Sequence, residues 1–261
     1  MYVRLVGSRV RSQLQYRASA ALQIFGTTLI ALLDLVTIVV IFDNVPELDG
    51  WTLQEVGLLY GIASISFALT DLVIGHLDRL PQMIRDGSFD QVLVRPLPSL
   101  LQVVASDFAL RRLGKAVQGL GVLVWALTAV EVDWTAGRAA MIPLAIVSGA
   151  VIYAGIWVAL ATVAFWIVDA IEFVNAFTYG GNFLSQYPVS IFGRWLRGLV
   201  VFVIPIAFVA YFPALYVLDK SDGLGLPEWF RFASPLVAAV VALGARLVWG
   251  NAVRRYRSAG G

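Results

Sequence analysis

The chain has 261 residues, of which 59% are hydrophobic and only 14% charged, with a net charge of +2. The apolar share exceeds the roughly 45–50% of soluble domains, so the composition indicates a polytopic membrane protein, and the small net charge argues against nucleic-acid binding. With no cysteine and a single histidine, His76, the sequence excludes disulfides, zinc–thiolate sites, cysteine nucleophiles and catalysis by histidine pairs.

Residues 1–17 predict an amphipathic helix that lies in the membrane interface. Four apolar residues at helical spacing fall on one face, and arginines and other polar residues lie roughly opposite (Val3, Val6, Val10 and Leu14 against Arg4, Ser8, Arg11 and Gln15). A signal peptide fits this stretch less well, because the following apolar run is too long and no small-residue cleavage site comes after it.

Six apolar stretches follow that are long enough to cross a hydrocarbon core about 30 Å thick. They cover residues 18–42, 56–77, 113–130, 139–168, 199–218 and 230–249. Short acidic or turn-rich loops separate them, and two prolines, Pro205 and Pro213, should kink the fifth. The sequence therefore predicts an all-α polytopic membrane protein that forms a single transmembrane domain of six helices over residues 1–261.

The positive charges give this topology an orientation. Sixteen of the 19 lysine and arginine residues fall on the side of the two termini, and the other three are Arg138, Lys220 and Arg231. The positive-inside rule then places both termini in the cytoplasm. On the same side the sequence predicts a loop at 78–108 and a second cytoplasmic or interfacial segment at 169–198. In the latter, Gly180-Gly181 breaks the chain and Pro188 starts a helix that leads into the fifth span.

The loop at 78–108 contains a stretch, Arg85 to Pro96, that predicts a short helix outside the membrane. Ser88 and Gln91 have the spacing of a capping box, and Arg95-Pro96 ends the helix. Phe89, Val92 and Leu93 then share one apolar face. Two interpretations remain open for it: a helix lying in the lipid interface, or a knob that docks into a cytoplasmic partner.

Two carboxylates are predicted inside the membrane, Asp34 in the first span and Asp71 toward the inner end of the second. A charge at mid-bilayer costs about 2.5–3.5 kcal/mol on insertion scales, so such residues usually face a cavity or a partner. They could attract a cationic or amphiphilic substrate or bind a proton, or they could pair with a polar neighbour or an arginine. Gly57-xxx-Gly61 permits close helix contact, either within the chain or with a second membrane subunit.

Several segments of the chain resemble the permease subunits of type-2 ATP-binding-cassette (ABC) exporters, in particular a bacterial branch described as viologen or multidrug exporters. The matching residues are Gly50-Trp51-Thr52, the run Ile84 to Leu97 (IRDGSFDQVLVRPL), Asn175 to Phe183 (NAFTYGGNF), Tyr187 to Phe192 (YPVSIF) and Phe202 to Pro205 (FVIP).

This resemblance implies that the 78–108 loop is the coupling helix, which docks into a groove of the ATPase. The implied coupling residues are Arg85, Gly87, Ser88, Phe89, Asp90, Val92, Leu93, Arg95 and Pro96. It also implies a bacterial cytoplasmic membrane protein that assembles with two ATPase subunits and a second permease, either a copy or a relative.

The chain itself has no phosphate loop, since Gly114-Lys115 is followed by Ala116 and lacks the earlier glycine. We therefore expect no enzymatic activity and no cofactor on this chain, with ATP and Mg²⁺ bound by the partner ATPase. The predicted function is export of a small amphiphilic or cationic compound. The alternatives are an ion-coupled secondary transporter and a membrane scaffold or assembly protein; an intramembrane enzyme is least consistent with the residues present.

Overall fold

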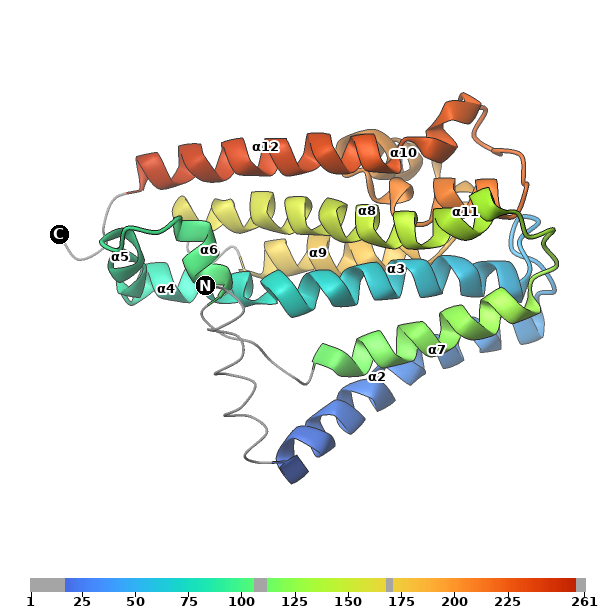
Figure 1. The fold of residues 1–261 in the computed structure, drawn as a ribbon, viewed down its shortest axis with the longest axis horizontal. Helices are drawn as coiled ribbons and strands as arrows, with labels where there is room; N and C mark the ends of the chain where they lie inside the picture. Colours follow the sequence, from blue (N-terminus) through green and yellow to red (C-terminus); the bar gives the residue numbers. More distant parts are fainter. Residues whose placement is uncertain (1–16, 106–111, 168–170, 257–261) are drawn as a thin grey trace.

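The computed structural model describes residues 17–105, 112–167 and 171–256, and this part of the chain is a bundle of helices (Figure 1). The predicted interfacial helix at 1–17 lies almost entirely outside the described residues. The α-helices are α2 (Arg17–Asn44), α3 (Leu53–Ile74), α4 (Leu80–Arg85), α5 (Ser88–Leu93), α6 (Ser99–Val104), α7 (Leu113–Ala129), α8 (Ala136–Ala161), α9 (Ile171–Ser185), α10 (Arg194–Gly198), α11 (Tyr211–Val217) and α12 (Ser234–Arg255).

Among the described residues, four helical segments are long and apolar enough to cross a membrane: Ala21–Asn44, Leu53–Arg85, Ala136–Phe165 and Ser234–Arg255. They overlap the first, second, fourth and sixth predicted spans. A fifth arises if the bent pair Arg194–Val203 and Ile206–Val217 is counted as one span, and α7 is apolar but only 17 residues long. The all-helical fold class is thus confirmed, with four to five candidate membrane spans among the described residues.

The helix α3 lies at the centre of the bundle, packed against α7, α8 and α9. Its first turn is fixed by a capping box: Thr52 accepts from the Glu55 backbone N–H, and Glu55 accepts from that of Thr52 at 2.8 Å. A side chain added at Gly61 would approach Leu123 Cα of α7 to 2.8 Å, and one at Gly57 would meet the Trp125 ring. Gly57 and Gly61 therefore allow α3 to pack closely against α7 within the chain.

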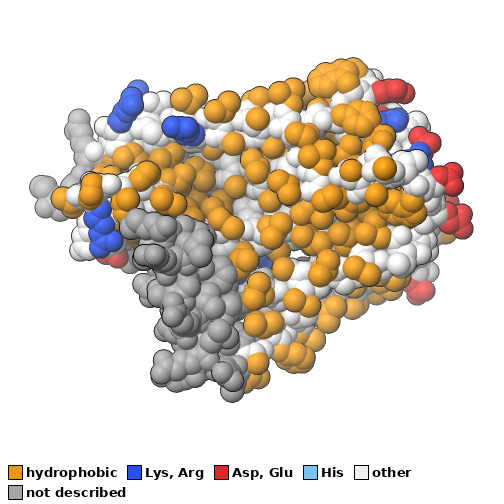
Figure 2. Space-filling model, viewed as in Figure 1, with side chains coloured by type: hydrophobic (Ala, Val, Ile, Leu, Met, Phe, Trp, Pro, Cys, Tyr) orange, Lys and Arg blue, Asp and Glu red, His pale blue; other side chains and the backbone are white. Residues whose placement is uncertain are grey.

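Charges separate toward the two ends of the bundle, as Figure 2 shows. We call the end that carries α4, α5, α6 and the C-terminal half of α12 the basic end; its arginines include Arg85, Arg95, Arg254 and Arg255. The acidic end carries the loops 45–52, 130–135 and 218–233. Between them the outward side chains are mostly apolar (Figure 2), which is the pattern of a bundle embedded in lipid.

The structure differs from the sequence prediction over residues 169–198, which were expected on the cytoplasmic side. Phe165, shortly before α9, contacts Trp249 at the basic end with ring centroids 5.7 Å apart. Ser190, shortly after α9, lies beside Gly223 in the acidic-end loop. Between these two points α9 runs inside the bundle against α3 and α8. The chain therefore traverses the bundle here, so residues 186–198 lie toward the acidic end and not beside the 78–108 loop, where the sequence prediction put them.

The stretch predicted as the fifth span, 199–218, consists of two arms, which together we call the hairpin. One arm consists of α10 and the π-helical turn η5 (Leu199–Val203), the other of η6 (Ile206–Phe208) and α11, and they are bent by 73° at Ile204-Pro205. Arg197 in the first arm donates to the backbone oxygens of Ser190 and Phe192, so this arm starts near the acidic end. Proline has no N–H to continue a helical ladder, which explains the break.

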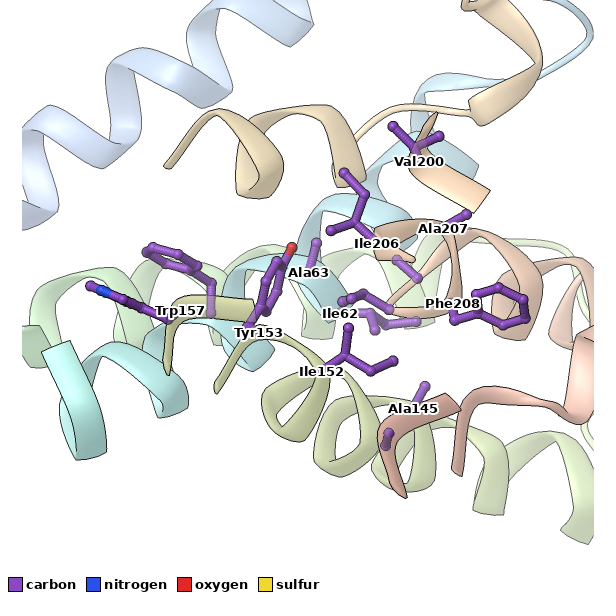
Figure 3. Packing of buried hydrophobic residues seen from close by; sticks show 14 of the residues in the cluster. Ile62, Ala63, Ala145, Ile152, Tyr153, Trp157, Val200, Ile206, Ala207 and Phe208 are labelled. Carbon is purple, nitrogen blue, oxygen red and sulfur yellow. The ribbon is translucent and has the colours of Figure 1, made fainter. Parts of the chain in front are cut away.

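The second arm of this hairpin returns to the acidic end. It is followed by Lys220, whose ammonium is 2.6 Å from Glu55 Oε2 and 2.6 Å from the Gly50 backbone oxygen. The tip of the hairpin packs into the bundle: Figure 3 shows Ile206 and Phe208 among core residues of α3 and α8, including Ile62 and Ile152. A long apolar run can therefore enter the bundle and leave it on the same side, which hydropathy alone does not reveal.

Candidate functional site

The chain leaves α3 at the basic end through the 3₁₀ turn η1 (Gly75–Arg79) and then forms the three short helices α4, α5 and α6. This places a helix at 88–93 outside the long segments, as the sequence predicts. Its start differs from the prediction. The N-cap is Gly87, in the left-handed region at φ 72°, and the Ser88 backbone N–H donates to Asp86 Oδ1 at 2.9 Å.

The predicted capping box between Ser88 and Gln91 is therefore wrong, because Ser88 is already the first helical residue and cannot cap its own turn. The side-chain oxygen that accepts a backbone N–H at the start of the helix belongs to Asp86 and not to Ser88. It stabilises the turn that precedes the helix. Hydrogen bonds from the Ser88 hydroxyl and backbone N–H lower the pKa of the Asp86 carboxyl, so the group stays ionised near neutral pH.

The apolar face of α5 is turned inward. Phe89 is fully buried and Val92 nearly so. The Phe89 ring lies 5.2 Å from Phe165 and 5.2 Å from Tyr256, centroid to centroid, and both contacts are edge-to-face. Phe165 follows α8 and Tyr256 follows α12, so α5 is fastened to the ends of two long helices. Phe89 and Val92 are therefore not free to fill a groove on a partner, contrary to the sequence-based interpretation.

Polar contacts fix the same region. Gln102 in α6 donates to the backbone oxygens of Val92, at 2.9 Å, and Leu97, at 2.8 Å. The Trp249 indole N–H of α12 donates to Ser99 Oγ at 3.1 Å. Burial and the nearby Asp90 carboxylate raise the pKa of Tyr256, so its hydroxyl stays protonated. These contacts make α5, α6 and the end of α12 one packed unit.

What α5 offers to solvent is the opposite side and its C-terminal end. Val94 is 83% exposed and Leu93 is 41% exposed. Five polar or proline residues near them in the sequence are also exposed: Arg85, Asp86, Gln91, Arg95 and Pro96. We call these seven residues the basic-end surface. Of the residues predicted to couple to an ATPase, Arg85, Leu93, Arg95 and Pro96 lie on it, whereas Gly87, Ser88, Phe89, Asp90 and Val92 shape or hold the helix.

A buried ion pair lies where α3 passes into η1. Arg112 Nε is 3.2 Å from Asp71 Oδ1, and Arg112 Nη1 donates to the Asp71 backbone oxygen at 3.0 Å. Gly75 makes room for this pair, since a side chain there would approach Arg112 Cζ to 2.7 Å. Asp71 thus has the arginine partner that one of the two sequence-based interpretations expected. The other predicted carboxylate, Asp34, belongs to α2, but its side chain lies outside the described part.

A second carboxylate, Asp78, joins this region and was missed as a site residue because the sequence placed it at the start of a loop. Asp78 accepts from the Trp157 indole N–H at 3.1 Å and from the Tyr179 hydroxyl at 3.2 Å. The three residues come from η1, α8 and α9. In Figure 3 Trp157 and Tyr153 extend from α8 beside one another. The sequence did show an acidic residue directly after an apolar segment. It could not show the partners of Asp78, because they lie 79 and 101 residues further along the chain.

Polar side chains continue from there into the bundle. Lys115 of α7 lies over the rings of Phe67 and Tyr179, 5.5 and 5.3 Å from their centroids. Gln118 donates to the Tyr60 hydroxyl at 2.7 Å. Helices α3, α7 and α9 thus share a polar zone between the basic end and the middle of the bundle.

Comparison with known proteins gives one match. A family model described as ABC-2 family transporter protein matches residues 28–260, about nine-tenths of the chain. No curated protein and no solved structure matches.

Proposed function

Because the chain belongs to the ABC-2 family of transporter proteins, we propose that it is the permease of an ATP-driven exporter whose ATP is hydrolysed by a separate subunit. The family match over residues 28–260 carries this proposal. The absence of a phosphate-loop motif from the sequence supports a separate ATPase. We propose two ATPase subunits and a second permease per complex, in a bacterial cytoplasmic membrane, with a small amphiphilic compound as cargo.

For the topology we propose six crossings, with α9 as the fifth in place of 199–218. The crossings are then α2, α3, α7, α8, α9 with its extension to Ser190, and α12. Arg194 and Arg197 move to the acidic side, which leaves 14 of the 19 lysines and arginines on the side of the termini. The remaining bias still supports cytoplasmic termini. The hairpin of α10 and α11 would then enter the membrane from outside and return.

The absence of cysteine makes this topology directly testable. Ile191→Cys, at a position 38% exposed, is expected to react with a membrane-impermeant maleimide added to intact cells. Gln91→Cys in α5 is the matched control and should react only after permeabilisation. Labelling of Ile191→Cys only in permeabilised cells would instead place 188–198 in the cytoplasm and remove α9 as a crossing.

For coupling to the ATPase we propose that the basic-end surface is the contact, with the buried side of α5 transmitting movement to the bundle. The exposed Leu93 and Val94 supply the apolar centre, and Arg85 and Arg95 supply charge at the rim. Because Phe89 contacts residues that follow α8 and α12, movement of α5 would reach these two helices as well as α3.

Val94→Asp tests this contact without touching the packed side. The change should reduce recovery of the ATPase subunits with the purified permease by about tenfold or more, because an exposed apolar anchor would be replaced by a charge that loses its water on binding. Leu101→Asp is the control, since Leu101 is 40% exposed on the neighbouring α6. Equal recovery of the ATPase with wild type and Val94→Asp would contradict the assignment of this surface.

A further inference from the structure

A small polar cavity lies between α3, α7 and α9, with a volume of about 30 Å³. Its lining residues are Tyr60, Ser64, Phe67, Lys115, Gln118, Asn182 and Gln186. The volume suits a water molecule or one compact polar group and is far too small for a whole drug-sized ligand. Any ligand would therefore place only one group here and leave its remainder outside the cavity.

The amides around this cavity are only partly satisfied by one another. Gln118 Nε2 donates to Tyr60, and Gln186 Nε2 lies 3.5 Å from Ser64 Oγ, at the limit of a hydrogen bond. The buried Asn182 Oδ1 has no hydrogen-bond partner among the described residues. Polar groups left without partners inside a lipid-embedded bundle are costly, so this cavity is built for something polar.

Lys115 adds a positive charge. Unlike Arg112, Arg138 and Lys220, Lys115 makes no ion pair within the described part of the chain. Its ammonium instead lies over two ring faces, and such contacts offset only part of the cost of a charge in hydrocarbon. An anionic group in the cavity would supply the missing counter-charge.

We propose that this cavity binds the acidic group of an amphiphile, a phosphate or a carboxylate, with Lys115 as its counter-ion. The proposal deepens the proposed function, on which it rests, by naming the substrate class. It departs from the cationic preference suggested by Asp34 and Asp71, because the Asp71 carboxylate is already paired with Arg112. The apolar part of the amphiphile would lie between the helices or in the surrounding lipid.

The test is binding of dodecyl phosphate to the full-length permease in phosphatidylcholine nanodiscs, corrected with empty nanodiscs. Lys115→Gln should raise the Kd by roughly tenfold or more, since a charge-assisted hydrogen bond is lost, whereas Lys115→Arg should retain most of the affinity. Arg246→Gln, which removes an exposed arginine of α12, is the matched control and should change nothing. Dodecyltrimethylammonium should show no dependence on Lys115.

A second variant guards against a folding defect in Lys115→Gln. Asn182→Asp keeps the lysine but places a carboxylate in the same cavity, and it should weaken dodecyl phosphate binding to a similar degree. Wild-type affinity in both variants, or an equal loss in Arg246→Gln, would overturn the proposal. Repeating the titration in phosphatidylglycerol nanodiscs identifies the source of the anion. If phosphatidylglycerol displaces dodecyl phosphate, the natural ligand is a lipid headgroup. If the affinity for dodecyl phosphate is unchanged, the natural ligand is a soluble amphiphile. Both results support the site.

This assay separates the inference from the exporter proposal because it needs no ATPase. Lys115-dependent binding by a permease that recovers no ATPase would keep the anion site and contradict the exporter. Recovery of the ATPase without Lys115-dependent binding would support the exporter and contradict the anion site.

Discussion

Phe89→Ala is expected to destabilise the basic end of the permease by about 3–5 kcal/mol, the usual cost of deleting a buried aromatic ring. Phe89 is fully buried and contacts Phe165 and Tyr256, so its removal opens a cavity between α5 and the ends of α8 and α12. The apparent melting temperature of the purified chain in mild detergent should fall. Limited proteolysis should cut between α4 and α6 before it cuts elsewhere.

Two companion variants make this result specific. Phe89→Leu refills most of the cavity and should recover a large part of the loss. Val94→Ala, one turn away at an 83% exposed position, should leave the melting temperature unchanged. An unchanged melting temperature and protease pattern in Phe89→Ala would mean that the ring faces a partner, as the sequence-based interpretation had it.

Asp71→Ala should cost a similar amount, about 3–5 kcal/mol, because it leaves the Arg112 guanidinium buried without its counter-ion. The side chains of Arg112 and Asp71 are only 13% and 9% exposed. Replacing both, as in Asp71→Leu with Arg112→Met, should recover much of the stability, since no uncompensated charge remains. The measurement is again the melting temperature, with the yield of monodisperse protein as a second readout.

The control for this pair lies at the other end of the molecule. Arg138 and Asp219 are 2.9 Å apart, but the Asp219 side chain is 74% exposed, so Asp219→Ala should cost about 1 kcal/mol or less. The contrast between the two pairs tests burial rather than charge. If Asp71→Ala kept full stability while transport of amphiphiles changed, Asp71 would belong to the substrate path instead.

The sequence located the long helices but not their exact ends. The predicted spans 56–77, 139–168 and 230–249 overlap α3 (Leu53–Ile74), α8 (Ala136–Ala161) and α12 (Ser234–Arg255), and their ends differ by three to seven residues. The capping box of Thr52 with Glu55 is a local signal for the start of α3 that hydropathy did not use. These features depend on residues within a few turns of one another, which a sequence shows directly.

The structure departs from the prediction between 169 and 217, where contacts with distant parts of the chain determine the fold. Polar side chains such as Thr178, Asn182 and Ser185 make α9 look unlike a crossing segment, yet Thr178 and Ser185 are buried and Ser185 hydrogen-bonds to Tyr153 of α8. Residues 199–217 are more apolar but bend at Ile204-Pro205. Hydropathy measures how well a segment tolerates lipid, and it does not say whether the segment goes through or turns back.

The candidate site, too, could be predicted from the sequence only in part. Helical spacing correctly grouped Phe89 with Val92 but wrongly included Leu93, which is 41% exposed. Periodicity also cannot tell which way an apolar face points. The contacts of Phe89 with Tyr256 and Phe165 turn this face inward, and these two residues lie 167 and 76 positions further along the chain. The sequence showed Lys115 as part of an incomplete phosphate-loop motif and as one of the positive charges on the side of the termini. It could not show the site, because Phe67 and Tyr179 come from other helices.

The shortness of α7 has a consequence for the surrounding lipid. At about 1.5 Å per residue, its 17 residues span about 25 Å, less than a hydrocarbon core of about 30 Å, and Lys115 in its first turns shortens the apolar length further. Val117, Leu120 and Val124 are exposed along this helix. Such a hydrophobic mismatch is relieved by local thinning of the bilayer. Acyl chains of adjacent phospholipids would compress beside α7, which brings headgroups and interfacial water closer to the level of Lys115. For the amphiphile proposed above, bilayer thickness would then govern how readily it reaches the bundle from the surrounding lipid.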